Sequence, residues 1–333
     1  MFDLIKKLTG TFGVSGNEEA IRNAIIEEIK AYVDDIKIDT MGNLIAVKKA
    51  NPERGNGKKI MLAAHMDEIG LIATYIDDNG FIRFSGIGGA SPYISLGQRV
   101  QFANGIIGAI HYEQKLESMK DLSLSKMYID IGAKSREEAL SMVSVGDVAC
   151  FSREAILQGD IISSKALDDR CGCAVLIETL KRLDSSNNEL YFVFTVQEEI
   201  GQRGAKTAAF GIMPDICIAI DVTRTGDTPE SKLMEVALGK GPAIKIMDRS
   251  VICHPFVKRL LDENAKKAGI SCQYEVLEQG GSDPGAIHIT GGGIPSGAVS
   301  IPCRYLHSPV ETISLSDAEN AVRLLVSTLS NYQ

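Results

Sequence analysis

Tryptophan is absent from this 333-residue chain, and aromatic residues make up only 6% of it. Few rings are therefore available to stack on sugars. No stretch approaches the roughly 20 apolar residues of a membrane-spanning helix, and the first residues, Met1 to Leu8, lack the apolar run of a signal peptide. The net charge of -8, with no basic cluster, argues against nucleic acid or an anionic membrane surface as the main partner.

The cysteines do not form the pattern of a secreted disulfide framework. Their number is odd, and most lie inside apolar stretches. Cys171-Gly-Cys173 could form half of a thiolate metal site, but no second cysteine pair accompanies it. We therefore expect buried thiols and a cytoplasmic protein. The seven are Cys150, Cys171, Cys173, Cys217, Cys253, Cys272 and Cys303.

Helices and strands alternate along the C-terminal half of the chain. Such alternation predicts an α/β fold, with a mostly parallel sheet flanked by helices. Helices are expected at 169–183, after Gly201, at 255–268 and at 316–330. Strands are expected at 36–39, 44–48, 59–65, 190–196, 216–221, 272–276 and 297–301. Near the N-terminus, Ser15-Gly-Asn-Glu18 has the form of a capping box, and apolar residues at helical spacing follow it.

His65 and Asp67 lie at the end of an apolar segment that reads as a central strand. Because they are two residues apart, their side chains point to the same face of that strand. His65 could bind a metal ion through one ring nitrogen while Asp67 orients the ring. The alternative is a buried histidine that simply forms a hydrogen bond with an aspartate.

Two acidic residues, Asp168 and Asp169, follow apolar residues and precede an expected helix. One of them is expected to cap the helix, which leaves the other free for a different role. Because a carboxylate has two oxygens, it can bridge two cations. We assign that bridge to Asp168 and a supporting role to Asp169.

Glu198 and Glu199 follow a strongly apolar strand, and Asp221 ends the next one. Open α/β sheets place their sites at the carboxyl ends of such strands. Adjacent residues there point in different directions, so Glu199 could bind metal while Glu198 faces a reacting water molecule. A solvated acidic turn is the alternative. His307 follows a later strand and would be a second histidine at the same edge, whereas His111, His254 and His288 lack comparable contexts.

The candidate residues leave out the middle of the chain. They occur before residue 68 and after residue 167, while 71–159 consists of short β-branched runs and glycine turns, with one clear helix at 134–142. This distribution predicts a discontinuous catalytic domain, 1–70 and 160–333, with an inserted β-rich domain at 71–159.

The candidate ligands favour a pair of divalent metal ions. Two such ions balance three carboxylates and one hydroxide, and mixed imidazole and carboxylate ligands suit Zn²⁺, with Co²⁺ or Mn²⁺ as alternatives. Two metals about 3.5–4 Å apart can activate a water molecule and polarise a carbonyl group. The ligand set is His65, Asp168, Glu199, Asp221 and His307, with Glu198 as the base.

Several segments resemble the dinuclear metallopeptidase family of glutamyl, leucyl and deblocking aminopeptidases that form tetrahedral shells. They occur in the family's order and span nearly the whole chain. Gly280-Gly-Ser-Asp283 is similar to a Gly-Gly-Thr-Asp segment of the family. The matching segments are Ala63-Ala-His-Met-Asp-Glu-Ile-Gly70, Lys165-Ala-Leu-Asp-Asp-Arg170, Val196-Gln-Glu-Glu-Ile-Gly201, Ile220-Asp-Val-Thr223 and Arg304-Tyr-Leu-His-Ser-Pro309.

The resemblance implies a zinc-exopeptidase-like catalytic domain, a dimerisation role for the inserted domain, and a homo-oligomer that is a dodecamer built from dimers. It also implies the same five metal ligands, Glu198 as general base and Asp67 as the residue that supports His65. Some relatives carry an endoglucanase label.

Three functions are candidates for a chain with these features. The first is a metal-dependent aminopeptidase that removes N-terminal residues from short peptides. The second is a glycoside hydrolase, which needs two carboxyl groups about 5–5.5 Å or 6.5–9.5 Å apart across a sugar. The sequence neighbours Glu198 and Glu199 are poorly placed for that task. The third is a non-catalytic oligomeric scaffold.

Overall fold

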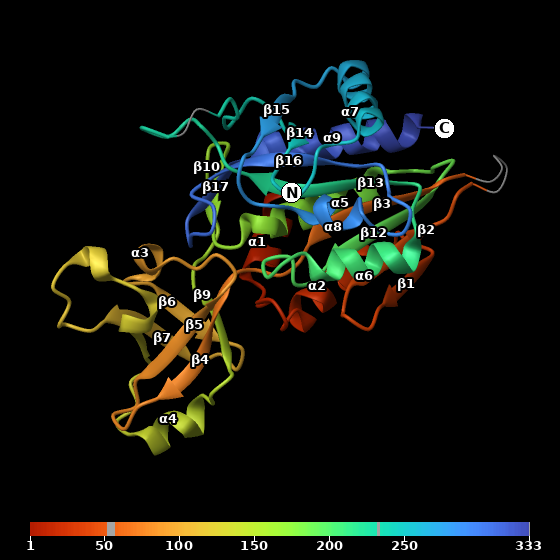
Figure 1. Ribbon diagram of the computed structural model, residues 1–333. Coiled ribbons are helices and arrows are strands. Elements are labelled where there is room, and N and C mark those ends of the chain that lie inside the picture. Colours follow the sequence, from red (N-terminus) through yellow and green to blue (C-terminus); the bar gives the residue numbers. More distant parts are fainter. Residues whose placement is uncertain (52–56, 232–233, 333) are drawn as a thin grey trace.

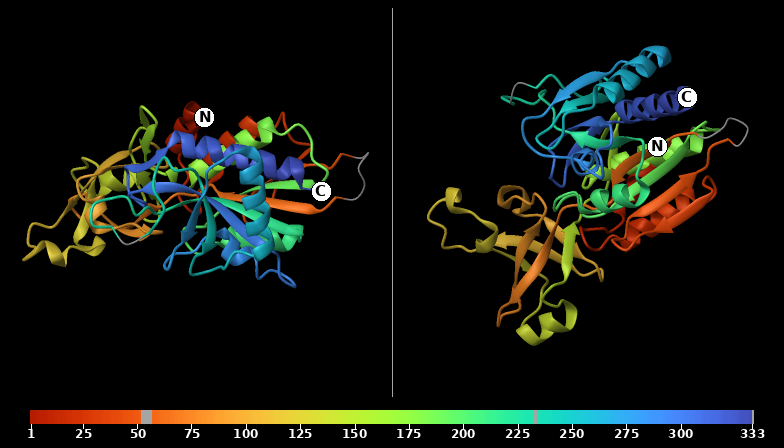
Figure 2. Two further views of the ribbon diagram at one scale, coloured as in Figure 1. Left: turned by 90° about the horizontal axis from the view of Figure 1, so that it is seen from above. Right: turned by 45° about the vertical axis from the view of Figure 1, so that its right-hand side comes forward.

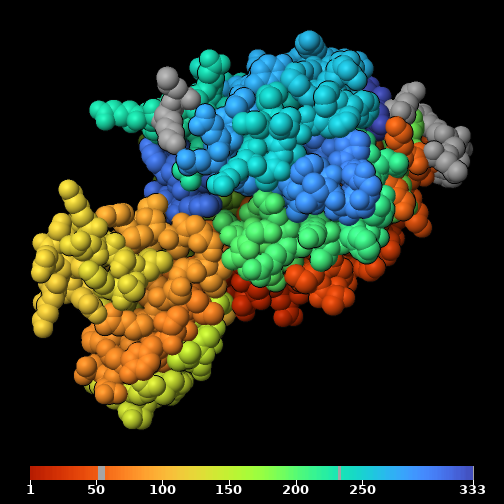
Figure 3. Space-filling view, viewed as in Figure 1, coloured from red at the N-terminus to blue at the C-terminus, as the bar shows by residue number. Residues whose placement is uncertain are grey.

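The computed structural model describes residues 1–51, 57–231 and 234–332. It contains a large sheet with helices on both faces and a smaller closed β-barrel beside it (Figures 1 and 2). The barrel projects from the larger unit in the space-filling view (Figure 3). Within the described residues, no helix combines the length and hydrophobicity that a bilayer span requires.

Four parallel strands form the centre of the large sheet. They are β12 (Glu189–Thr195), β3 (Lys59–His65), β13 (Ile216–Thr223) and β16 (Ser296–Arg304), in that order. Their residues are almost entirely buried, as expected for strands that are covered on both faces. Parallel alignment brings the carboxyl ends of these strands to the same edge.

Three flanking strands pair antiparallel with this centre: β2 (Leu44–Lys48) with β12, and β14 (Ala243–Met247) and β17 (Glu311–Ser314) with β16. Among the other flanking strands, β15 (Gln273–Val276) pairs parallel with β14. The predicted α/β class with helices around the sheet is therefore confirmed, and parallel pairing is concentrated at its centre. Four flanking strands were not expected from the sequence, namely β10, β11, β14 and β17. The flanking strands are β1 (Asp35–Ile38), β2 (Leu44–Lys48), β10 (Ile156–Gln158), β11 (Ile161–Ser164), β14 (Ala243–Met247), β15 (Gln273–Val276) and β17 (Glu311–Ser314).

Helices cover each face of the sheet with a separate apolar core. The larger core contains side chains of five helices and the smaller one contains side chains of two. The first group is α1 (Phe2–Gly10), α2 (Glu19–Ile29), α5 (Leu167–Arg182), α7 (Pro255–Ala268) and α9 (Leu315–Asn331). The second group is α6 (Arg203–Ile212) and α8 (Asp283–Ile287).

The expected capping box at Ser15 is wrong. Helix α2 begins at Glu19, and its buried face contains Ile21, Ile25 and Ile29, as the spacing predicts. Ser15 instead donates a hydrogen bond to the Asp67 carboxylate, with its oxygen 2.6 Å from Oδ2. A tertiary partner has therefore replaced the local one, and the serine belongs to the surroundings of the candidate site.

The barrel has its own apolar core, which is separate from those of the sheet. Its strands follow the closed order β4-β5-β8-β7-β6-β9. The helix expected at 134–142 is present as α4 (Arg136–Met142), and a short helix, α3 (Pro92–Ser95), follows β5. The strands are β4 (Gly70–Ile76), β5 (Ile82–Ile87), β6 (Arg99–Phe102), β7 (Ile107–Tyr112), β8 (Met127–Asp130) and β9 (Val148–Phe151).

Candidate metal centre

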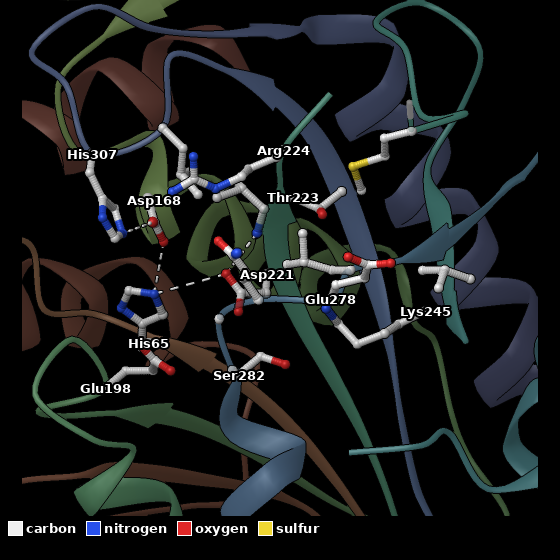
Figure 4. Close-up of a pocket in the computed structure, with 18 of the residues that line it drawn as sticks. His65, Asp168, Glu198, Asp221, Thr223, Arg224, Lys245, Glu278, Ser282 and His307 are labelled. Carbon is white, nitrogen blue, oxygen red and sulfur yellow. Dashed lines mark hydrogen bonds and ion pairs between the residues drawn. The ribbon is translucent and has the colours of Figure 1, made fainter. Parts of the chain in front are cut away.

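The residues singled out in the sequence converge at the carboxyl edge of the parallel strands (Figure 4). This is the edge at which open α/β sheets bind their ligands. All of them lie at a strand end or just after one, apart from Asp168 at the start of α5. His65 ends β3, Glu198 and Glu199 follow β12, Asp221 lies in β13, and His307 follows β16.

Two groups of three ligand atoms meet here and share Asp168. In the first, His65 Nε2 lies 3.0 Å from Asp168 Oδ1 and 3.9 Å from Asp221 Oδ1. In the second, His307 Nε2 lies 3.2 Å from Asp168 Oδ2 and 3.5 Å from Glu199 Oε2. Within each group the ligand atoms are no more than 4.8 Å apart. The two oxygens of Asp168 therefore face two different histidines.

The Glu311 side chain accepts hydrogen bonds from the backbone of Asp168 and of His307. It was not among the site residues predicted from the sequence. Its Oε2 accepts a hydrogen bond from the backbone N–H of Asp168 at 3.0 Å, and its Oε1 accepts one from His307 at 2.8 Å. The residue lies only four positions after His307, but its contact with Asp168 depends on the pairing of β11 with β17. The single buried carboxylate of Glu311 therefore holds the backbone of both Asp168 and His307, two members of the second group.

Asp169 forms the contact expected of a helix cap. Its Oδ1 accepts a hydrogen bond from the backbone N–H of Gly172 at 2.9 Å. Asp168 and Asp169 have non-helical backbone angles, so the regular part of α5 starts after them. This local break turns the Asp168 carboxylate toward the histidines while its neighbour caps the helix.

Asp67 touches more than the ring of His65. The His65 Nδ1 atom lies 3.1 Å from the Asp67 backbone oxygen and 3.6 Å from its Oδ1. The carboxylate also accepts hydrogen bonds from the backbone N–H groups of Glu198 at 3.0 Å and Glu199 at 3.2 Å. Together with the bond from Ser15, these contacts make Asp67 a buried anchor for both the ring and the acidic turn.

A buried ion cluster attaches the N-terminal segment behind the site. Glu68 pairs with Lys165 at 2.6 Å and with Arg170 at 3.2 Å. The Arg170 guanidinium also donates to the backbone oxygens of Leu8 and Thr11. Both cations contact the one Glu68 carboxylate, and backbone oxygens accept further guanidinium N–H groups, so each buried charged group has a polar partner.

The pKa values of three candidate carboxylate ligands, Asp168, Glu199 and Asp221, are shifted from their usual range. Burial raises the pKa of Asp221 to about 8, and the charge of Asp168 adds to this effect. Burial also raises the pKa of Glu199 well above its usual value, again with a contribution from Asp168. Burial opposes ionisation of Asp168 as well, but hydrogen bonds from His307 and His65 outweigh it and lower its pKa. These carboxylates repel one another, so a bound cation would be strongly favoured.

The ligand chemistry fits divalent ions at both groups. Each group offers one imidazole and two carboxylates, the mixed set that suits Zn²⁺ and related metals. The nearby Cys171 and Cys173 do not add to this set. Both are fully buried, and the Cys173 Sγ donates to the backbone oxygen of His65 at 3.2 Å. All seven cysteines are free thiols.

A cavity of about 1100 Å³ extends from the candidate ligands. Its walls include Thr223, Lys245, Glu278 and Ser282. Figure 4 shows Lys245 and Glu278 beyond Asp221 as seen from the two histidines. Such a volume accommodates a ligand of several residues or a drug-sized molecule. The other three histidines lie elsewhere: His111 on β7, His254 at the start of α7 and His288 after α8.

Comparison with known proteins identifies relatives along the whole chain. A relative from Acetivibrio thermocellus that carries an aminopeptidase name is 68% identical over 329 residues, which are 99% of this chain and 98% of the relative. Aminopeptidase APDkam598 from the archaeon Desulfurococcus kamchatkensis has a similar structure, with a TM-score of 0.95, 40% identity and coverage of 100% and 95%.

Two further solved structures bear on assembly and on the competing function. The TET1 peptidase of Pyrococcus horikoshii, described as assembling into a tetrahedron or a large octahedral shell, has a TM-score of 0.89, 37% identity and 99% coverage of both chains. A Thermotoga maritima protein named endoglucanase has a TM-score of 0.83 and 33% identity, with coverage of 98% and 96%.

The family model for M42 glutamyl aminopeptidases matches residues 42–324. This range contains all seven predicted site residues, from His65 to His307. The fold, the candidate centre and the relatives agree with this match. The chain therefore belongs to the M42 glutamyl aminopeptidase family of metallopeptidases.

Proposed function

We propose that the aminopeptidase activity of this chain depends on two divalent metal ions, Zn²⁺ or Co²⁺, held by the five predicted ligands. His65 and Asp221 would bind one ion, Glu199 and His307 the other, and Asp168 would bridge them. The observation that carries this proposal is the pair of three-residue groups that share Asp168. When bound, the ions would polarise the scissile carbonyl group and make water a better nucleophile.

Glu198 would serve as the general base and acid. Its carboxylate takes a proton from the attacking water molecule and delivers it to the nitrogen of the leaving amine. Two features support the role: Glu198 lines the cavity beside the candidate ligands, and Asp67 fixes its backbone. Burial raises the pKa of Glu198 well above its usual value, and the charges of Asp283 and Asp221 add to this rise.

Asp67 would act as a positioning residue. It holds the His65 ring and the backbone of Glu198 and Glu199 at the same time. Through its backbone oxygen and its carboxylate, Asp67 would therefore set a proposed ligand on each metal and the proposed base relative to one another.

Short peptides with a free N-terminus are the proposed substrates. The cavity continues past Asp221 toward Lys245 and Glu278, which leaves room for an N-terminal side chain. Neither alternative function gains support. The carboxylates of Asp168 and Glu199 converge on the ring nitrogens of His65 and His307, as metal ligands do. A scaffold would not require these residues to converge.

A panel of aminoacyl p-nitroanilides (Leu, Glu, Lys and Ala) tests the proposal directly. We expect cleavage of at least one substrate, its loss in EDTA, and its return when Zn²⁺ or Co²⁺ is added, because the reaction depends on the bound ions. The rate of p-nitroaniline release is the measurement. Cleavage that persists after complete metal removal would contradict the metal-dependent mechanism, and absence of cleavage in every condition would exclude these substrates.

The barrel, within the inserted domain 71–159, is proposed as the dimerisation domain of a dodecamer. The assembly described for the Pyrococcus horikoshii relative supports this, and so do exposed apolar side chains on the barrel and its loops. These include Tyr75, Tyr93, Ile107 and Met119. Light scattering coupled to size exclusion should give about twelve times the mass of one chain, whereas a monomer at micromolar concentration would refute the assembly. The cytoplasmic location stays a prediction, which cell fractionation would check.

A further inference from the structure

Two glycines of the barrel lie against the second group of candidate ligands. Gly88 and Gly89 follow β5 in the loop that leads to α3. This loop is distant in sequence from Glu199 and His307, yet its backbone approaches both residues closely. The inserted domain therefore contributes to the wall of the candidate centre.

Gly89 lies against the edge of the His307 ring that points away from the carboxylates. A Cβ atom at position 89 would lie 2.1 Å from His307 Nδ1 and 2.7 Å from its Cε1. On the other side of the ring, Nε2 faces Asp168 at 3.2 Å and Glu199 at 3.5 Å. The imidazole is thus confined between a glycine backbone and two carboxylates.

Gly88 makes the corresponding approach to Glu199. A Cβ atom at position 88 would lie 3.1 Å from Glu199 Oε2 and 2.8 Å from the Ile69 side chain. The residue also has a φ of +72°, a conformation that other residues rarely adopt. An added Cβ on either glycine would therefore crowd one of the two candidate ligands that are unique to the second group.

We propose that Gly88 and Gly89 are positioning residues for the second metal site, acting through Glu199 and His307. The inference rests on the proposed roles of those two residues as ligands. A Cβ at position 89 reaches even a 3.0 Å contact only if the His307 ring and the Gly89 backbone separate by about 0.9 Å. Metal–ligand distances tolerate only about 0.2 Å, so a displacement of the ring by even part of this amount weakens coordination by His307.

Gly89→Ala is the cleaner variant, because Gly89 does not have a positive φ and alanine adds only the clash with His307. Metal-free protein is titrated with Co²⁺ while its visible absorption is followed. We expect the first equivalent to bind as in the wild type and the second to bind at least about tenfold more weakly. Gly211→Ala is the matched control, because a Cβ there meets no atom within 4 Å.

A double-mutant cycle separates ligand positioning from a general structural effect. In a His307→Ala background the clash is gone, so Gly89→Ala should have no further effect on Co²⁺ affinity. If Gly89→Ala alone fails to fold, the double variant should fold. Tight binding of two Co²⁺ by Gly89→Ala, additive effects in the cycle, or a double variant that stays unfolded would each overturn the inference. A wild-type protein that binds fewer than two Co²⁺ would instead contradict the proposed dinuclear centre.

Discussion

Glu198→Gln should lower kcat by about 10²- to 10⁴-fold while leaving the content of bound metal unchanged. Glutamine has nearly the same shape as glutamate, but it cannot take a proton from the attacking water, and proton transfer contributes about that factor. The backbone N–H of Glu198 would still donate to Asp67, so the acidic turn should keep its position. Steady-state kinetics on the best p-nitroanilide and metal analysis by mass spectrometry provide the two measurements.

The same chemical change made far from the site controls for general effects. Glu263→Gln replaces an exposed glutamate on α7 and should leave both kcat and metal content as in the wild type. Turnover of Glu198→Gln within a few-fold of the wild type would show that another group moves the proton. A loss of metal together with activity would show that Glu198 is a ligand.

Asp168→Asn should abolish high-affinity binding of both metal ions, and activity should fall to background. The two oxygens of Asp168 face His65 and His307 separately. An amide supplies only one good ligand atom and no charge, so we expect binding at both positions to weaken by more than about 100-fold. Titration of the metal-free protein with Zn²⁺ measures both affinities.

Variants of unshared ligands provide the comparison for Asp168. Asp221→Asn should weaken the binding of only one metal ion, because Asp221 lies beside His65 and not in the second group. Asp3→Asn, an exposed aspartate on α1, should have no effect. If Asp168→Asn still bound one ion tightly, Asp168 would belong to a single site and the proposed bridge would be wrong.

The candidate site residues at strand ends could be predicted, because each follows or ends an apolar run in the sequence. An apolar strand followed by a carboxylate or histidine predicts a buried polar group at the sheet edge, as at His65 and Asp221. The convergence of these groups is what the structure adds. Their roles as ligands and base stay predictions that the variants above would check.

Contacts between distant segments could not be anticipated. Ser15 carries the local signature of a helix cap, yet its hydroxyl bonds to Asp67, which lies 52 residues away. Glu311 and Gly89 look like ordinary turn or strand residues until β17 and the barrel loop are placed beside the site. Strands β11 and β17 were missed for a related reason. They are four residues long and rich in hydroxyl side chains, so their apolar pattern is weak.

The position of β3 in the sheet also constrains how the protein is made. This apolar strand pairs with β12 on one side and β13 on the other, and both are encoded far downstream of it. During translation β3 therefore stays unpaired with these two strands until Glu189–Thr195 and Ile216–Thr223 have left the ribosome. All strands of the barrel emerge in the interval. Because domains generally fold as units, the insertion can complete its core while the first strand of the catalytic centre is still exposed to chaperones.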